Sequence, residues 1–333
     1  MTPADEFDRP AASSRQGGDA GAVPTDAGDG VHEFADEAMG TTWGIVIAGV
    51  DAEYARTAAL AAFEELHRLE TELSRFNPAS DVSQIGRLRA GQAVRVGLDT
   101  FACLKASARV YAATDGAFDV TLGRLQNLWW PKEGRADPPD AHEIAKARRC
   151  TGMHLLILDE GQHAVGARAG RVTVDLGGIG KGYAVDQMVE LLKDWSIESA
   201  LVHGGRSTVF GLGTPPGKDG WPIAAYGPGK KPGTLGSAHL RDQALSGSGS
   251  PPGSRHVLDP RTGRPAEGNL GAWVVTARAT DADALSTAFL VMRPEEVEHY
   301  CRQHAGTSGM LLGEKEPGKV HRFGTAWTSV GAE

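Results

Sequence analysis

The densest group of chemically useful residues lies in the stretch 171–186, RVTVDLGGIGKGYAVD. Alternating apolar residues predict a short strand over 171–176, which includes Asp175. Four glycines and Lys181 fall within the next six residues, and apolar spacing predicts a helix over 183–195. A strand, a glycine-rich turn and a helix start expose backbone N–H groups, and Lys181 adds positive charge. We therefore expect this turn to bind a phosphate or pyrophosphate.

The turn matches neither of the two common phosphate-binding fingerprints. A Walker A loop needs a glycine five residues before its Gly-Lys pair and a Ser or Thr after it. Asp175 and Gly182 occupy those places here. A dinucleotide fingerprint needs Gly-x-Gly-x-x-Gly, whereas these glycines recur at every second position from Gly178 to Gly182. The alternative is an ordinary turn whose glycines serve packing alone.

A second group of oxygen donors lies about 100 residues downstream. Asp283, Ser286 and Thr287 have the i, i+3, i+4 spacing that places side chains on one face of a helix. A carboxylate with hydroxyls and nearby carbonyls suits Mg²⁺, a hard cation that keeps water and binds substrate phosphates. In the alternative, Asp283 is a favourable charge in the first helical turn, and Thr287 only packs. Asp281 is predicted to be the N-cap of this helix.

Other candidate residues are more isolated in the sequence. Asp119, in the loop GAFDVT, and Asp175 are predicted either to bind a ligand or to cap turns. His256 and His203 are candidates for proton transfer, or are structural histidines. Met39 precedes a glycine and either covers a flat ring or is simply buried.

The predicted elements alternate unevenly along the chain. Asp51 precedes a helix over 52–75 whose apolar residues recur every three or four positions. Asp99 is predicted to cap a second helix, and a helix is predicted over 281–292. Several strands follow one another without an intervening helix, which favours an α+β fold over a doubly wound parallel sheet.

The charge distribution separates an acidic tail from a nearly neutral body. The chain has 333 residues and a net charge of −8; nine of its 42 acids and two of its 34 bases lie in residues 1–38. Residues 1–32 contain few large apolar side chains, and we predict a disordered tail followed by one domain over 33–333. The near-neutral body argues against nucleic-acid binding. No transmembrane stretch, signal peptide or early lipid-anchor cysteine is visible, so the default expectation is a cytoplasmic location.

These motifs occur together in an order that resembles the ApbE-like FAD:protein FMN transferases, over about residues 34–325. The matching segments are MGT from Met39, LSRF from Leu73, GAFDVT from Gly116, DLGGIGKGYAVD from Asp175, HVLDPRTG from His256 and DALSTA from Asp283. The resemblance implies an α+β fold of the T-fold type. Antiparallel sheets and helices would form two lobes, with the FAD site between them.

The resemblance also implies an activity and a set of site residues. The activity is Mg²⁺-dependent transfer of FMN from FAD to a Thr or Ser of an acceptor protein, with release of AMP. His256 and Asp283 would be catalytic. The implied FAD-binding residues are Met39, Phe76, Ala117, Phe118, Asp119, Asp175, Lys181 and Val257. The implied Mg²⁺ ligands are the Gly178 carbonyl, Asp283, Ser286 and Thr287.

Three departures from the family pattern keep other activities open. Arg206 stands where the family usually has Asp, and residues 246–254 are rich in Gly and Pro where relatives carry an aromatic residue. Many relatives are exported or lipid-anchored, and no such signal is visible here. The alternatives are a Mg²⁺-dependent FAD pyrophosphatase, with water as the acceptor, or a non-catalytic FAD-binding protein.

Overall fold

The computed structural model confirms the α+β class and the antiparallel sheets. It describes residues 30–131, 137–227, 233–249, 256–314 and 319–328. Every ladder between named strands of this part of the chain is antiparallel. The expected division into two lobes stays a prediction.

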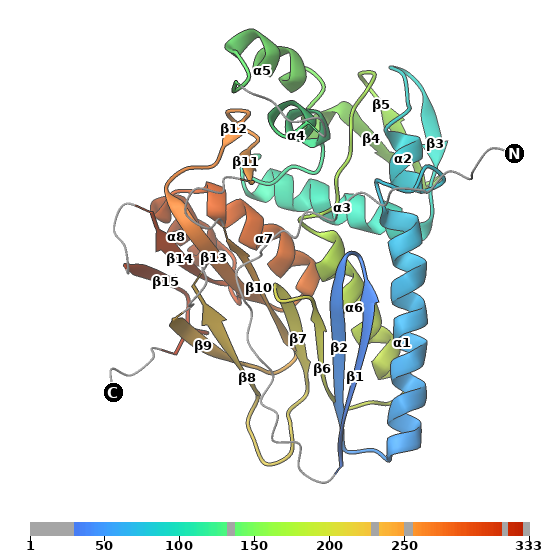
Figure 1. The fold of residues 1–333 in the computed structure, drawn as a ribbon, viewed down its shortest axis with the longest axis vertical. Coiled ribbons are helices and arrows are strands. Elements are labelled where there is room, and N and C mark those ends of the chain that lie inside the picture. The colour runs from blue at the N-terminus through green and yellow to red at the C-terminus, as the bar shows by residue number, and fades with distance from the viewer. Residues whose placement is uncertain (1–29, 132–136, 228–232, 250–255, 315–318, 329–333) are drawn as a thin grey trace, which may run out of the picture.

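The main sheet runs across the whole body of the molecule (Figure 1). Within the described ranges it has eight strands, and its spatial order departs from the chain order. In spatial order they are β1 (Val31–Ala38), β2 (Thr41–Ala48), β6 (Ser199–Gly204), β7 (Thr208–Leu212), β10 (Gln243–Gly249), β13 (Asn269–Thr276), β14 (Ser308–Gly313) and β15 (Val320–Phe323). Strands β7 and β10, far apart in sequence, are therefore neighbours near the centre.

Three smaller sheets complete the strands that the structure describes. The first contains β3 (Ala93–Arg95), β5 (Ala164–Ala167) and β4 (Leu156–Asp159). The second pairs β8 (Trp221–Tyr226) with β9 (Thr234–Leu240), and the third pairs β11 (Leu258–Asp259) with β12 (Arg264–Pro265). Strands β4 and β5 form an antiparallel hairpin before the glycine-rich turn.

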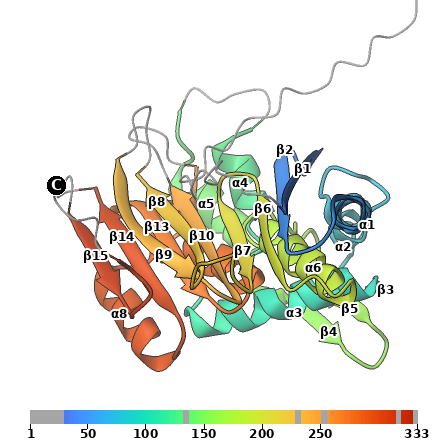
Figure 2. The same ribbon diagram turned by 90° about the horizontal axis from the view of Figure 1, so that it is seen from below.

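Helices cover one face of the main sheet, as Figure 2 shows for α3 and α6. The helices are α1 (Ala52–Leu73), α2 (Asp81–Ile85), α3 (Leu98–Ala113), α4 (Gly123–Trp129), α5 (Ala141–Arg148), α6 (Gly180–Asp194), α7 (Ala279–Val291) and α8 (Pro294–Gln303), with a 3₁₀ turn at Met153–Leu155. The Asp51 side chain accepts hydrogen bonds from the Glu53 and Tyr54 amides, which confirms the predicted cap of α1.

The largest hydrophobic cluster lies between this face and the helices α1, α3, α6 and α7. It includes Trp43, Leu66, Leu104, Met188 and Phe289. A second cluster fills the other face beneath β8 and β9, and a small third cluster lies under α4 and α5. The helices that carry the candidate residues, α6 and α7, are thus fixed by the main core.

The predicted strand over 171–176 was wrong. The segment makes only one isolated bridge, between Thr173 and Leu122, and the Asp175 amide donates a hydrogen bond to the Val120 carbonyl. Val172 and Val174 are nevertheless buried, so the apolar alternation reflects packing without a strand ladder. Sequence reasoning also missed α4. The predicted cap by Asp99 was wrong, because α3 begins at Leu98 after Gly97 and Asp99 lies in its first turn.

Helix α6 begins earlier than expected, at Gly180, so two of the glycines lie within its first turn. At the amino end of the chain, β1 begins at Val31, two residues inside the segment predicted to be disordered. The rest of that segment, 1–29, lies outside the described residues. In the part of the chain that the structure describes, no helix combines the length and apolar character needed to cross a bilayer.

Candidate functional site

The glycine-rich turn and the downstream acidic helix meet directly. The Gly182 amide, in the first turn of α6, donates a hydrogen bond of 3.0 Å to Asp283 Oδ2 on α7. A Cβ at Gly182 would lie 2.1 Å from the Ala279 carbonyl oxygen and 2.7 Å from the Asp283 Cβ. Only glycine permits this approach of the two helices, so a glycine here is a packing requirement.

The second oxygen of Asp283 is held by the main sheet. Thr208 on β7 and Ser246 on β10 each place a hydroxyl 3.4 Å from Asp283 Oδ1. Their own hydroxyls are 3.0 Å apart, and Ser246 Oγ is also 3.0 Å from the Ser207 carbonyl oxygen. Asp283 is buried, so these donors satisfy a carboxylate that water scarcely reaches.

Three further hydroxyls lie next to this carboxylate. Ser286 Oγ donates to the Asp283 carbonyl at 2.9 Å, and Ser248 Oγ lies 2.8 Å from Ser286 Oγ and 3.3 Å from Thr287 Oγ1. An ideal Cβ on Gly178 would lie 3.2 Å from Thr287 Oγ1. The structure therefore brings together all four residues that were expected to bind Mg²⁺. It adds Ser248, which the sequence analysis missed.

The donor chemistry of this cluster fits a hard cation. Carboxylate, hydroxyl and backbone carbonyl oxygens are the ligand types that Mg²⁺ prefers. Among the described residues, no group of three or more His, Cys, Asp or Glu side chains is placed to hold a metal ion. A cation at Asp283 would therefore rest on one carboxylate and neutral oxygens, and would need water or substrate phosphate oxygens to complete its coordination.

A carboxylate on α6 fixes the start of α7. Asp186 Oδ1 accepts a hydrogen bond from the Ala279 amide at 2.8 Å. Asp186 Oδ2 accepts from the Thr280 amide at 3.0 Å and from the Thr280 hydroxyl at 2.5 Å. The predicted N-cap role of Asp281 was wrong, because Asp281 instead forms an ion pair with Arg109 at 2.5 Å. A cap supplied by a distant segment leaves no local sequence signal.

The GAFDVT loop lies against the glycine-rich turn. An ideal Cβ on Gly178 would lie 3.4 Å from the Phe118 ring, and both Ala117 and Phe118 are buried. Asp119 Oδ1 accepts hydrogen bonds of 2.7 Å from the Thr121 amide and hydroxyl. Burial raises the pKa of the Asp119 carboxyl, and these hydrogen bonds oppose the rise. Asp119 therefore shapes its own turn, whether or not it also binds a ligand.

Asp175 sits at the centre of a polar group that the sequence analysis had only partly identified. Its Oδ1 accepts a hydrogen bond from the Gly177 amide at 2.9 Å, and its Oδ2 lies 3.1 Å from Arg75 Nη1. Arg75 Nη1 also donates to Gln126 Oε1 on α4 at 2.9 Å. Phe76 follows Arg75 in the same loop, and 76% of its surface is exposed. The Arg75 guanidinium lies 4.8 Å from the centre of the Phe76 ring.

Lys181 and Met39 stand apart from these hydrogen-bonded groups. Lys181 is the second residue of α6 and is half-buried, and no hydrogen bond or ion pair among the described residues involves its ammonium. Met39 follows β1 with φ of +50°, and its amide donates to Glu70 Oε1 at 2.5 Å. Its side chain packs partly against the main core.

His256 and Val257 are the first residues of the described segment that leads into β11. Both are half-buried, and Val257 packs against the main core. The Val257 carbonyl accepts a hydrogen bond from the Ala266 amide at 2.8 Å, which closes the base of the β11–β12 hairpin. This hairpin therefore holds the backbone next to His256.

The remaining candidates lie around the turn between β6 and β7. His203 Nδ1 is 3.2 Å from the Gly205 carbonyl oxygen, and burial lowers the His203 pKa, which favours a neutral ring. Arg206 is exposed in the same turn. Residues 250–255 lie outside the described residues. They make up most of the Gly- and Pro-rich segment that differs from the family pattern.

Sequence comparisons identify relatives over most of the chain. The model of the ApbE family matches residues 39–311. The FAD:protein FMN transferase of Klebsiella pneumoniae (strain 342) is 31% identical over 301 residues, which cover 84% of this chain and 83% of the relative. The protein of the same name from Escherichia coli (strain K12) is 29% identical over 311 residues, which cover 85% of this chain and 84% of the relative.

Solved structures agree in fold. The ApbE protein of Thermotoga maritima superposes with a TM-score of 0.78 at 30% identity, covering 88% of this chain and 97% of that one. The apo form of the Pseudomonas stutzeri flavinyl transferase ApbE gives a TM-score of 0.78 at 27% identity, covering 88% and 94%. The family model spans the glycine-rich turn, both helices that meet at Gly182 and the strands that hold Asp283, and this chain belongs to the ApbE family.

Proposed function

We propose that this protein is an FAD:protein FMN transferase. It transfers FMN from FAD to a Thr or Ser hydroxyl of an acceptor protein, depends on Mg²⁺ and releases AMP. The observation that carries the proposal is the hydrogen bond between the Gly182 amide and Asp283 Oδ2. It joins a turn suited to a pyrophosphate with an oxygen cluster suited to a divalent cation. The names of the relatives support the same activity.

The residues of this chain divide the proposed work between them. Lys181, at the positive end of α6, neutralises the pyrophosphate of FAD. Asp283, Ser286, Thr287 and the Gly178 carbonyl hold Mg²⁺, which polarises phosphate oxygens and neutralises the charge that develops on them. Phe76, Phe118 and Met39 supply apolar surface for the rings of FAD. Asp175, fixed by Arg75, lies at the start of the glycine-rich turn.

The proposed chemistry is a single phosphoryl-group exchange. The acceptor hydroxyl oxygen bonds to the phosphorus of the FMN half, and the bond from that phosphorus to the bridging oxygen breaks. AMP leaves with the bridging oxygen. His256 accepts the hydroxyl proton in this scheme, as its half-buried place before β11 allows. Such a reaction needs charge neutralisation and positioning more than a covalent protein intermediate.

One incubation separates this proposal from its alternatives. The protein is mixed with FAD, Mg²⁺ and a peptide that carries an acceptor Thr, and the products are analysed by mass spectrometry. Covalent FMN on the peptide together with AMP is the expected result. Free FMN with AMP and an unmodified peptide would identify a pyrophosphatase. Unaltered FAD would identify a protein that binds FAD without catalysis. An acceptor peptide with Thr replaced by Val is the matched control.

A further inference from the structure

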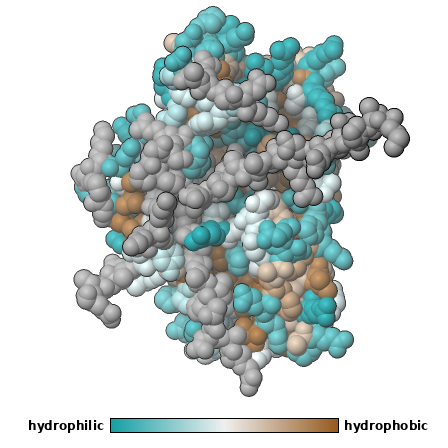
Figure 3. Space-filling model, in the orientation of Figure 1, coloured by the Kyte–Doolittle hydropathy of each residue, from teal (hydrophilic) through white to brown (hydrophobic). Residues whose placement is uncertain are grey.

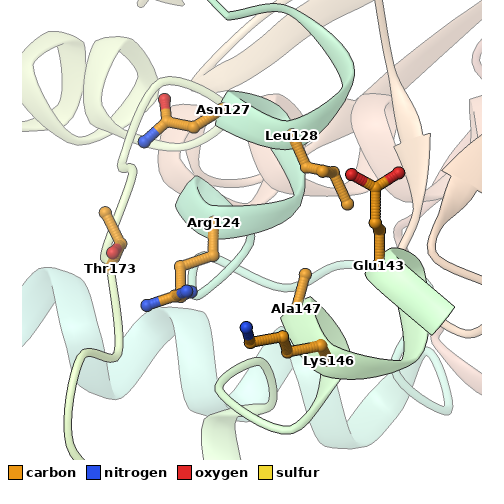
Figure 4. A pocket seen from close by; sticks show the side chains of 7 residues that line it. All are labelled: Arg124, Asn127, Leu128, Glu143, Lys146, Ala147 and Thr173. Atoms are coloured by element: carbon orange, nitrogen blue, oxygen red, sulfur yellow. The ribbon is translucent and has the colours of Figure 1, made fainter. Parts of the chain in front are cut away.

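A cavity of about 450 Å³ lies outside the cluster around Asp283. Helix α4 forms one wall with Arg124, Asn127 and Leu128, helix α5 another with Glu143, Lys146 and Ala147, and Thr173 closes a third side. Figure 4 shows these side chains around a common space. The surface over α5, at the top of Figure 3, is mainly hydrophilic. The volume is within the range of small-molecule sites, about 300–1,000 Å³.

The cavity contains two cations without a partner. In the part of the chain that the structure describes, neither Arg124 nor Lys146 forms a hydrogen bond or an ion pair. Figure 4 shows the two side chains extending toward each other from α4 and α5. Like charges that face one space without a counter-ion create a positive potential, which attracts an anion.

Glu143 also lines the cavity, but its carboxylate does not pair with Arg124 or Lys146. Glu143 Oε2 accepts a hydrogen bond from the Asp140 amide at 3.0 Å, as part of the capping box of α5. In Figure 4 this carboxylate lies across the cavity, beside Leu128 and away from both cationic groups. Helix capping therefore accounts for the position of Glu143, and Arg124 and Lys146 have no carboxylate partner among the described residues.

The donors define the ligand. Arg124 and Lys146 supply charged N–H donors, and the Asn127 amide and the Thr173 hydroxyl add neutral donors elsewhere in the wall. Charged N–H donors of this kind suit an oxyanion. Leu128 and Ala147 add apolar surface, and the volume exceeds what one phosphate needs. We infer that this cavity is a second binding site, and that it takes a small phosphomonoester with its phosphate between Arg124 and Lys146.

The cavity is separate from the candidate flavin site. Gln126, on a different face of α4, accepts the hydrogen bond from Arg75 that belongs to the Asp175 group. The two sites nevertheless share a wall, because the Gly123 amide donates to the Thr173 carbonyl at 3.1 Å, two residues before Asp175. The inference depends only on the cavity and does not require the proposed transferase activity.

The test is calorimetric titration of the full-length protein with glycerol 3-phosphate and with inorganic phosphate, without Mg²⁺. Arg124→Gln and Lys146→Gln are each expected to weaken binding about tenfold or more, since each removes a charged donor. Lys193→Gln is the matched control, because Lys193 is a surface cation on α6 that pairs with Glu190. The affinity of this control variant for glycerol 3-phosphate is expected to stay within twofold of that of the parent protein.

A second control identifies the site that is filled. Lys181→Gln removes the cation expected at the flavin pyrophosphate and should leave binding of glycerol 3-phosphate unchanged. If only this variant lost binding, the phosphate would bind at the flavin site, and the inference would be overturned. The inference would also be overturned by the absence of saturable binding. It would be overturned as well if the Arg124 and Lys146 variants bound glycerol 3-phosphate as tightly as the parent protein does. Thermal melting shows that each variant is folded, and Lys146 is exposed enough to be replaced without disturbing α5.

Discussion

The two halves of the candidate site are built differently. Around Asp283 the polar side chains are buried and hydrogen-bonded to one another, through donors from α6, β7 and β10. Around Lys181 and Phe76 the side chains are half-buried or exposed, and the structure gives the Lys181 ammonium no partner among the described residues. The proposed cation-binding half is thus preorganised, whereas the proposed flavin-binding half presents groups that a ligand would engage.

This difference follows from the cost of burying charge. A buried carboxylate without hydrogen bonds would destabilise the fold, so its donors must be present before any ligand arrives. An exposed ring or a partly exposed ammonium carries no such requirement, because water solvates it. Substitutions in the first half should therefore lower the activity and also the stability of a protein that still folds, and substitutions in the second half should affect ligand binding alone.

The largest effect is expected for Asp283→Ala. The change removes the one carboxylate of the proposed Mg²⁺ site, and Mg²⁺-dependent turnover should fall about a thousandfold or more. The protein should remain folded, since its neighbours can hydrogen-bond to each other. Mass spectrometry of a flavin-modified acceptor peptide measures the effect. Asp281→Ala, in the same helix, should retain activity, and full activity of Asp283→Ala with Mg²⁺ would refute the metal assignment.

Gly182→Ala should cause the largest loss of stability. Its Cβ would lie 2.1 Å from a backbone oxygen, so α6 and α7 must separate, at a cost of about 3 kcal/mol in the free energy of unfolding. Gly180→Ala is the matched control, because its nearest neighbour would be 3.7 Å away. That variant should be unchanged or more stable by up to about 1 kcal/mol. Urea denaturation of both variants distinguishes a required contact from ordinary helix propensity.

Asp186→Ala should destabilise the protein by about 2 to 3 kcal/mol. The change leaves the Ala279 and Thr280 amides at the start of α7 without their acceptor. The comparison variant is Asp281→Ala, which loses an ion pair with the largely exposed Arg109 and should cost no more than about 1 kcal/mol. Equal stability losses in urea denaturation would contradict the assignment of Asp186 as the residue that positions α7.

Phe76→Ala should have the smallest effect on the fold. Because the ring is largely exposed, the free energy of unfolding should change by less than about 0.5 kcal/mol. FAD affinity should nevertheless fall about three- to tenfold if the ring packs against the flavin. Fluorescence titration with FAD measures this change. Leu60→Ala, an exposed apolar residue on α1, should leave the affinity unchanged, and equal affinities in both variants would argue against Phe76 as a flavin contact.

The sequence predicted some local arrangements correctly and others wrongly. The spacing of Asp283, Ser286 and Thr287 correctly placed them on one helical face, because that spacing is a local property of the helix. The strand assigned to 171–176 was wrong, since alternating burial does not require a ladder partner. The N-cap assigned to Asp281 was wrong because a cap from another helix satisfies the same amides.

The sequence alone determined the α+β class, the Asp51 cap and periodic apolar face of α1, the glycine-rich turn and the ordered motifs of the family. Each of these depends on neighbouring residues or on motif order. Only the tertiary structure decided that Asp186 caps α7, that Thr208 and Ser246 hold Asp283, and that Arg75 pairs with Asp175. These partners lie far apart in the chain, and they meet because the strand order of the main sheet and the packing of α6 on α7 bring them together.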